Sequence, residues 1–314
     1  MAKLLEGKVA IVTGAGRGIG RAEALLLANK GAMVVVNDAG VHFDGTGKAS
    51  GPADEVVNEI KAKGGKAVAN YESVSDFQGA KRIIDAAISN FGKLNILVNN
   101  AGILRDRMFF NMSEQEWDEV IAVHLKGTFN CARHACGYWR DEHKAGRIHY
   151  GKIINTTSDA GLLGNLAQAN YGAAKAAIAA FSLIVSREMK RYDVTSNCVA
   201  PNARTRMTTD ASPAGAAVMG EAPPPGQWDP MSPDHVARLA AYLASDDAKD
   251  ITGEVFRVVA DTVWLLQGWH SINKVSKNKK DWTPEELGPA IKKMVEKAPP
   301  KPEIASVFQE AGLI

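Results

Sequence analysis

Short apolar runs alternate with longer amphipathic stretches along most of the chain. Each run has the length and apolar composition of a strand that is buried on both faces, and a stretch with helical periodicity follows it. This rhythm predicts an α/β fold of the Rossmann type, a doubly wound parallel sheet with helices on both faces. About seven strands are expected, over residues 8–13, 33–37, 66–71, 95–99, 152–157, 194–199 and 254–259.

The alternation ends near residue 260. Residues 261–314 are rich in Lys and Pro, and their short amphipathic piece at 284–297 offers too little apolar surface for a core of its own. We therefore expect a Rossmann domain over residues 1–260 and a C-terminal extension over 261–314 that docks on this domain or on a partner subunit.

An irregular segment, residues 205–232, follows the sixth predicted strand. Ligands of open α/β sheets bind at the carboxyl edge of the strands, so this segment is expected to be a lid over the substrate. A flexible surface loop is the alternative interpretation.

The first strand leads into a glycine-rich turn and then into a helical stretch. The turn, residues 14–20, forms with the preceding Thr13 the pattern T-G-x-x-x-G-I-G, which is more specific than the general G-x-G-x-x-G pattern. Glycines let the backbone approach a pyrophosphate, whose charge is met by free amides at the start of the helix. We expect Gly14, Arg17, Gly18, Ile19 and Gly20 to bind a dinucleotide.

The second strand ends in Asp38, at about the distance at which an acid meets the adenosine ribose. A carboxylate there would repel a 2′-phosphate, which favours NAD over NADP as the cofactor. Arg17 beside the turn weakens this preference, because its guanidinium can neutralise such a phosphate.

Tyr171 and Lys175 are four residues apart and therefore share a helix face. The Lys175 ammonium is expected to favour the ionised phenol and to bring its pKa, ordinarily near ~10, toward a working pH. Ser158 ends an apolar run upstream and would hydrogen-bond the same oxygen. Such a trio can take a proton from an alcohol or give one to a ketone. The alternative is an ordinary amphipathic helix with a snorkelling lysine.

The composition limits the class of protein. The chain has 314 residues, 46% of them hydrophobic, and a formal net charge of +2, so neither nucleic acid nor a membrane surface is expected as a partner. It has no apolar run of ~18 residues and no signal-peptide core at its start, and its last three residues are not a peroxisomal address, so a cytoplasmic location is expected. The three cysteines and seven histidines show no ligand spacing, and no metal site is expected.

Together with Asn99-Asn100-Ala101-Gly102 after the fourth strand, these motifs resemble the short-chain dehydrogenase/reductase family. The likeness is closest to the (3R)-hydroxyacyl-CoA dehydrogenase part of peroxisomal multifunctional enzymes of type 2. It covers essentially the whole chain. The further motifs that carry it are Gly164-Asn165, Gln168-Ala169-Asn170-Tyr171, Ala200-Pro201-Asn202-Ala203, Arg206-Met207-Thr208, Gly268-Trp269 and Trp282-Thr283-Pro284-Glu285.

The resemblance implies an NAD-dependent oxidation of (3R)-3-hydroxyacyl-CoA in fatty-acid or steroid side-chain β-oxidation. Tyr171 would be the base and Lys175 would also hold the nicotinamide ribose. The residues bordering the cofactor would be Val74, Asn100, Ala101 and Gly102 on the adenine side, and Pro201, Asn202 and Ala203 at the nicotinamide. It also implies a homodimer in which the extension helps to complete a neighbour's active site.

The sequence departs from the family at two positions. Pro201-Asn202 replaces the commoner Pro-Gly, so the amide geometry there can differ. His124 stands where most of the family has an asparagine that anchors a water leading from the lysine to solvent. A histidine can anchor the same water through one ring nitrogen. The alternative is a satisfied helix histidine with no role in proton transfer.

Other functions remain open at this stage. Within enzymes, the alternatives are a 3-oxoacyl thioester reductase and a hydroxysteroid dehydrogenase. Outside enzymes, the alternative is a nicotinamide-binding redox sensor, although a sensor has no use for Ser158, Tyr171 and Lys175. A basic run in the extension, Lys274, Lys277, Lys279 and Lys280, is expected to help hold the CoA phosphates, with a solvated charged face as the alternative.

Overall fold

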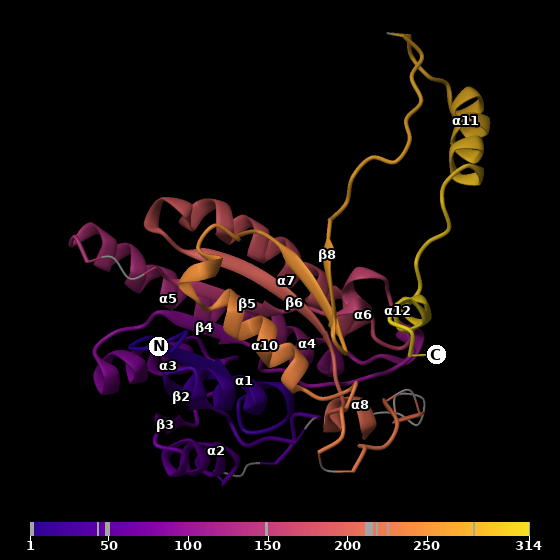
Figure 1. Ribbon diagram of the computed structural model, residues 1–314. Coiled ribbons are helices and arrows are strands. Elements are labelled where there is room, and N and C mark those ends of the chain that lie inside the picture. The colour runs from indigo at the N-terminus through magenta and orange to yellow at the C-terminus, as the bar shows by residue number, and fades with distance from the viewer. Residues whose placement is uncertain are drawn as a thin grey trace.

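The computed structural model describes residues 3–313, except 43, 48–50, 148–149, 211–215, 218, 225 and 279. Its centre is a sheet of eight strands within this range, in the order β3-β2-β1-β4-β5-β6-β7-β8 (Figure 1). The first seven strands are parallel and β8 is antiparallel to β7. The strands are β1 (Val9–Thr13), β2 (Met33–Asn37), β3 (Lys66–Asn70), β4 (Ile96–Asn99), β5 (Lys152–Thr156), β6 (Thr195–Asn202), β7 (Val255–Val259) and β8 (Thr262–Leu266).

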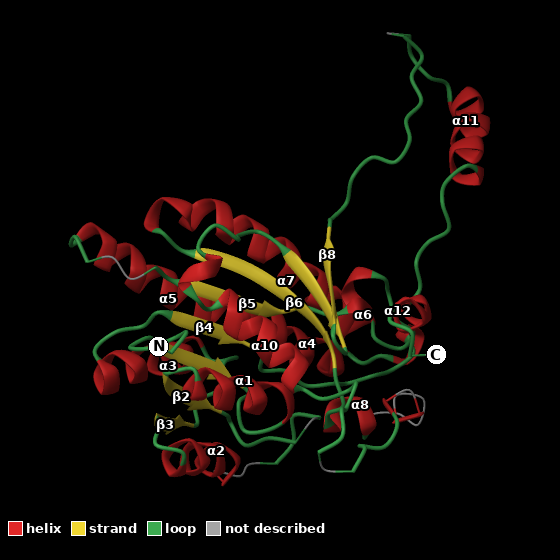
Figure 2. Cartoon of the chain, in the orientation of Figure 1, coloured by secondary structure: helices red, strands yellow, loops and turns green. Residues whose placement is uncertain are grey.

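Helices cover both faces of the sheet (Figure 2). Helices α1, α2 and α10 share one apolar cluster with the sheet, and α3, α5 and α7 share another. The helices are α1 (Gly18–Asn29), α2 (Gly51–Ala62), α3 (Phe77–Phe91), α4 (Glu114–Ile121), α5 (Gly127–Lys144), α6 (Asp159–Leu162), α7 (Ala169–Met189), α8 (Arg206–Thr209), α10 (Asp234–Leu243), α11 (Pro284–Glu296) and α12 (Ile304–Glu310). A π-helical segment, Ala122–Lys126, joins α4 to α5.

Strand β1 shows why its apolar run has no polar alternation. Ala10 and Val12 pack toward α1 and α10, whereas Val9 and Ile11 pack toward α3 and α5. Since successive side chains of a strand point to opposite faces, a strand that is covered on both sides must be apolar at every position.

All seven predicted strands are present, and their bounds shift by at most a few residues. The eighth strand, β8, comes from the segment assigned to the extension. Its connection to β7 is a two-residue turn, Ala260-Asp261, in which Ala260 has a φ of 53°. Ala-Asp is a weak turn signal beside the Asn-Gly or Asp-Gly of most such hairpins, which is why the sequence did not reveal this strand.

The C-terminal extension leaves the body and returns to it (Figure 1). We call residues 267–303, between β8 and α12, the arm. It carries α11, in which no described residue is buried. In contrast, α12 docks on the same chain, where Val307 and Phe308 are buried against Met219, Met231 and Val259.

Helix α7 is long and apolar enough to cross a membrane by length and composition alone. It packs against α4, α6 and β6, which is the position of a core helix in this fold.

One buried carboxyl group has an oxygen that lacks a hydrogen-bond partner among the described residues. Glu23, in α1, is 1% exposed, and its Oε2 makes no hydrogen bond within the described residues. Burial raises the pKa of its carboxyl group to about 8.

Candidate active site

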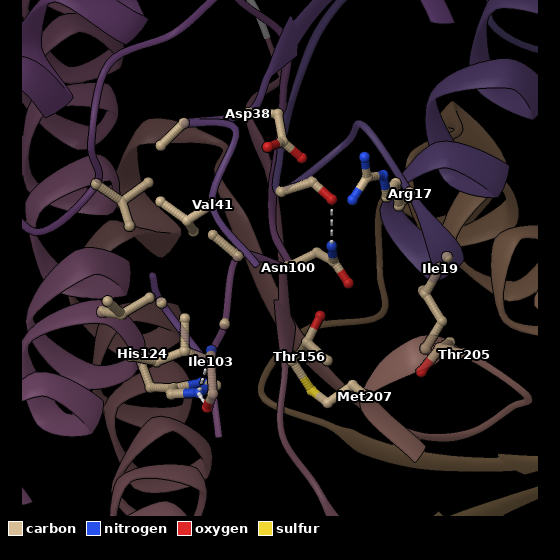
Figure 3. Close-up of a pocket in the computed structure, with 18 of the residues that line it drawn as sticks. Arg17, Ile19, Asp38, Val41, Asn100, Ile103, His124, Thr156, Thr205 and Met207 are labelled. Carbon is tan, nitrogen blue, oxygen red and sulfur yellow. Dashed lines mark hydrogen bonds between the residues drawn. The ribbon is translucent and has the colours of Figure 1, made fainter. Parts of the chain in front are cut away.

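A cleft of about 480 Å³ opens at the carboxyl ends of β1, β2, β4 and β5 (Figure 3). The strand order reverses between β1 and β4, which is where open α/β sheets bind their ligands. The predicted residues that line it are Gly14, Arg17, Gly18, Ile19, Asp38, Val74, Asn100, Ala101, Gly102, His124, Tyr171, Lys175, Pro201 and Ala203. We call the part beside the glycine turn the turn end and the part beside Tyr171 the reacting end.

The turn end is shaped by backbone that leaves no room for side chains. Gly14 has a φ of 62° and Gly18 a φ of 54°, which favour glycine. A Cβ on Gly20 would lie 2.3 Å from the carbonyl oxygen of Gly14. Gly20 does not line the cleft itself, but it lets α1 begin against the turn.

The first amides of α1 are free to bind an anion. Arg17 precedes the helix without a side-chain cap, and no acid lies in the first turn. The positive end of the helix dipole therefore faces the cleft, which is the arrangement that holds a pyrophosphate. These residues fit a dinucleotide.

Asn100 fastens β4 to the turn. Its Nδ2 donates to the carbonyl oxygens of Thr13 (3.1 Å) and Gly14 (3.2 Å), a contact visible in Figure 3. In return, Oγ1 of Thr13 accepts from the backbone amides of Asn100 (3.1 Å) and Ala101 (3.2 Å). Thr13 was not among the predicted site residues, although its place directly before Gly14 was a usable signal.

Asp38 lies beside the turn and is held by backbone. Oδ2 accepts from the Gly16 amide and Oδ1 from the Gly40 amide, both at 2.8 Å. Each oxygen keeps a lone pair for a ribose hydroxyl. The Arg17 side chain also lines this end of the cleft (Figure 3); it is exposed and forms no ion pair with any described residue.

The reacting end joins β5, α6 and α7. Lys175 is buried, and its Nζ donates to the carbonyl oxygen of Thr156 at 2.6 Å and lies 5.5 Å from the centroid of the Tyr171 ring. Ser158 caps α6, where its Oγ accepts from the Ala160 amide at 3.2 Å, and its hydroxyl is close enough to Tyr171 to lower the phenol pKa. The structure thus brings the predicted trio together.

The prediction that the phenol pKa of Tyr171 is lowered toward a working pH is wrong for the chain by itself. Burial raises the pKa of Tyr171 to about 12, and the Ser158 hydroxyl opposes this only in part. Burial also lowers the pKa of Lys175 to about 7. The spacing predicted that Lys175 would lower the phenol pKa, but desolvation of the phenol dominates and Lys175 is not among the groups that shift it.

His124 lies in the π-helical segment, edge-on to Tyr171, with ring centroids 5.1 Å apart. Its Nε2 lies 2.8 Å from the oxygen and 3.1 Å from the nitrogen of Ile103, and its buried Nδ1 has no partner within the described residues. Burial first, and then Lys175, lowers the pKa of the imidazole to about 3, so the ring is neutral. A Cβ on Gly102 would lie 2.3 Å from the imidazole, so only glycine fits there.

The adenine and nicotinamide sides follow the predicted positions with one exception. Val74 lines the cleft, and its carbonyl is held by Asn130 at 2.8 Å. Pro201 and Ala203 line it at the other end. The Asn202 side chain does not line the cleft.

The lid prediction covers residues that the structure describes only in part. Among them, Thr205, Arg206, Met207 and Thr208 line the cleft, and Figure 3 labels Thr205 and Met207. A Cβ on Gly18 would lie 3.2 Å from the Thr205 side chain. Of these four residues, the sequence analysis singled out Arg206-Met207-Thr208, as a motif of the family resemblance. Thr156 also lines the cleft and was missed.

The basic run does not reach this cleft within one chain. Lys277 forms an ion pair with Glu286 and lies 5.5 Å from the Trp282 ring centroid, all on the arm. Lys274 and Lys280 also lie on the arm, away from the cleft, and Lys279 is outside the described residues. A CoA role for these lysines therefore finds no support in a single subunit.

Comparison with known proteins identifies the family of this chain. Residues 8–215 match the family described as short chain dehydrogenase. Hydroxyacyl-CoA dehydrogenase ChsB1 of Mycobacterium tuberculosis is 47% identical over 285 residues, which are 90% of this chain and 87% of that protein. Peroxisomal multifunctional enzyme type 2 of Mus musculus is 38% identical over 281 residues, or 89% of this chain but 35% of that longer protein.

A solved structure agrees. The crystal structure of a short chain dehydrogenase from Mycobacterium avium has a TM-score of 0.84 and 48% identity, covering 95% of this chain and 98% of that one. The family match spans the turn, the lysine and the tyrosine described above. The chain belongs to the short-chain dehydrogenase family.

Proposed function

We propose that this protein oxidises (3R)-3-hydroxyacyl-CoA to 3-oxoacyl-CoA with NAD. The observation that carries the proposal is that Tyr171 and Lys175 line one end of a dinucleotide cleft, with Ser158 next to the phenol. Support for the substrate class comes from the mycobacterial relative, a hydroxyacyl-CoA dehydrogenase that this chain matches over most of both lengths.

The chain's own side chains supply the proton chemistry. The substrate hydroxyl binds between Ser158 and Tyr171, and Ser158 holds the oxygen while Tyr171 takes its proton. Lys175, fixed on Thr156, would hold the ribose of a bound nicotinamide beside the reacting carbon. A bound nicotinamide would accept the hydride. In reduction, Tyr171 returns the proton to the ketone oxygen.

NAD is proposed over NADP because of Asp38. Its position is fixed by two backbone amides, so it cannot turn away from a 2′-phosphate. A like-charge contact of this kind in a partly buried pocket costs several kcal/mol, by order of magnitude. Arg17, which lines the same end of the cleft, works against this preference because its guanidinium can neutralise a phosphate.

A homodimer is also part of the proposal. The arm exposes Trp269, Ile272, Val275, Ile291 and Val295, an unusual number of apolar side chains for a segment with no buried helix residues. A second copy that covers them would bring the arm's lysines near another subunit.

Initial rates test the proposed activity. The panel contains (3R)- and (3S)-hydroxyacyl-CoA of several chain lengths and a 17-hydroxysteroid, each with NAD and with NADP. We expect turnover of the (3R) thioesters with NAD. Preference for the (3S) series or for the steroid alone would contradict the substrate, and nicotinamide binding without turnover of any member would favour a redox sensor.

A further inference from the structure

A buried ion pair lies directly behind Ser158. Arg257, in β7, donates from Nε (2.8 Å) and Nη2 (2.7 Å) to Oδ1 of Asp159, the residue that follows the serine. Asp159 is 4% exposed and Arg257 is 6% exposed. Charges this deep are tolerated only as a pair, because loss of one leaves the other buried and uncompensated.

The second oxygen of Asp159 reaches the other side of the reacting end. Asn202, the last residue of β6, donates from Nδ2 to Oδ2 at 3.0 Å. One carboxylate therefore ties together α6, β6 and β7. This contact explains why the Asn202 side chain is turned away from the cleft.

The outer side of the guanidinium is closed by the last strand. Trp264, in β8, pairs with Arg257 in register, and its ring centroid lies 6.0 Å from the guanidinium carbon. Trp264 in turn packs on the cluster that holds Val307 and Phe308 of α12. The C-terminal extension thus helps to shield the ion pair from water.

The negative charge of Asp159 affects the pKa of the Tyr171 phenol. Burial is the main reason for the high pKa of Tyr171, and the carboxylates of Asp106 and Asp159 raise it further. The other ionisable groups that face the ring are Lys175 and the neutral His124. Arg257 is paired to the Asp159 carboxylate and is therefore placed to offset its effect on the phenol.

We propose that Arg257 is a positioning residue for this reaction: through Asp159 it fixes Ser158 and Asn202, and it cancels a negative charge beside the Tyr171 phenol. The inference rests on the proposed role of Tyr171 in proton transfer. Nothing in the local sequence signals it, since Asp159 and Arg257 are 98 residues apart.

Three variants test the proposal. Arg257→Met leaves the Asp159 charge unpaired, Arg257→Lys keeps a cation, and the double variant Asp159→Asn/Arg257→Met removes both charges. Lysine is a fair replacement because both contacts of Arg257 converge on a single oxygen. The direct measurement is the pH at which tyrosinate absorbance from Tyr171 begins, with the same protein carrying Tyr171→Phe subtracted.

In Arg257→Met we expect this onset to move up by roughly 0.5–1 pH unit. The kcat should fall by roughly tenfold to a hundredfold, with NAD affinity little changed, because Ser158 is displaced. Arg257→Lys should keep the wild-type onset and most of the kcat. The double variant should return the onset to the wild-type pH but keep a reduced kcat.

Arg204→Met is the matched control. Arg204 forms a comparable pair with Asp229 at 2.6 Å, at the base of the lid, and losing it should leave the tyrosinate onset unchanged. An unmoved onset in Arg257→Met, or an equal shift in the Arg204→Met control, would overturn the proposal.

Two further outcomes remain decisive. Where Arg257→Met does not fold, the double variant alone decides. A wild-type kcat in the double variant overturns the positioning role. A lowered kcat in the double variant, with an unmoved tyrosinate onset, supports it. A tyrosinate shift in a protein that turns over no hydroxyacyl-CoA would sustain this inference while contradicting the proposed substrate.

Discussion

The two ends of the cleft are built from different materials. At the turn end, backbone does the binding: Gly14, Gly18 and Gly20 make the space, and free amides of α1 provide the charge. At the reacting end, buried side chains form the site. Burial raises the pKa of Tyr171 and lowers the pKa of Lys175. The space at the turn end is specified by residues that are neighbours in sequence. The ionisation of the groups at the reacting end depends on segments that meet only in the folded chain.

Among these variants, Tyr171→Phe should lower kcat the most, and it changes only the reacting end. It removes the only phenol oxygen at the site but keeps the ring, so kcat should fall by roughly 10²–10⁴-fold. NAD affinity should stay near the wild-type value, because the turn end is untouched. Steady-state kinetics and cofactor titration by fluorescence measure the two. Loss of both together would erase the distinction between the ends.

Glu23→Gln tests the one buried acid described beneath the turn end. The carboxyl group keeps its proton to about pH 8 in the folded state but loses it near pH 4.5 when unfolded. The wild type should therefore lose stability as pH rises from about 4.5 to about 8, by an amount on the order of a few kcal/mol. The variant lacks this loss, so denaturant unfolding at pH 9 should show it to be the more stable protein. Equal stability of both proteins at about pH 4, below the start of this loss, is the control, and equal stability at pH 9 would contradict burial of the acid.

Asp38→Ala should change the cofactor preference at the turn end without touching the chemistry. We expect the ratio of kcat/KM for NAD over NADP to fall by roughly tenfold, since a repulsive contact with a 2′-phosphate is removed. The kcat at saturating NAD should change little. A wild-type protein that uses both cofactors equally would refute the role of Asp38.

His124 should give the smallest effect, and two variants are needed. Its unpartnered Nδ1 beside Tyr171 suits a group that anchors a water for proton exchange. His124→Asn should stay within about threefold of the wild-type kcat, and His124→Leu should lose roughly tenfold. Equal kcat in both variants, with unchanged melting temperatures, would make His124 a packing residue.

The same contrast decides what could be predicted from sequence. The turn, Asp38 and the Tyr171-Lys175 pair were found because their meaning lies in spacings of a few residues. The ion pair of Asp159 and Arg257 could not be found, because the two residues belong to separate βαβ units. The phenol pKa was misjudged for a related reason, since helix spacing shows that Lys175 is near but not how much water the fold excludes. Strand β8 was missed because its turn is atypical.

The arm is anchored at both ends, by β8 in the sheet and by α12 in its apolar cluster. A protease that cuts this exposed segment once would therefore produce a nicked protein, and we expect the C-terminal fragment to remain bound through Val307 and Phe308. Such a two-piece molecule would migrate as two bands in a denaturing gel and as one species in native chromatography. The extension can thus be severed from the chain without being lost from the fold.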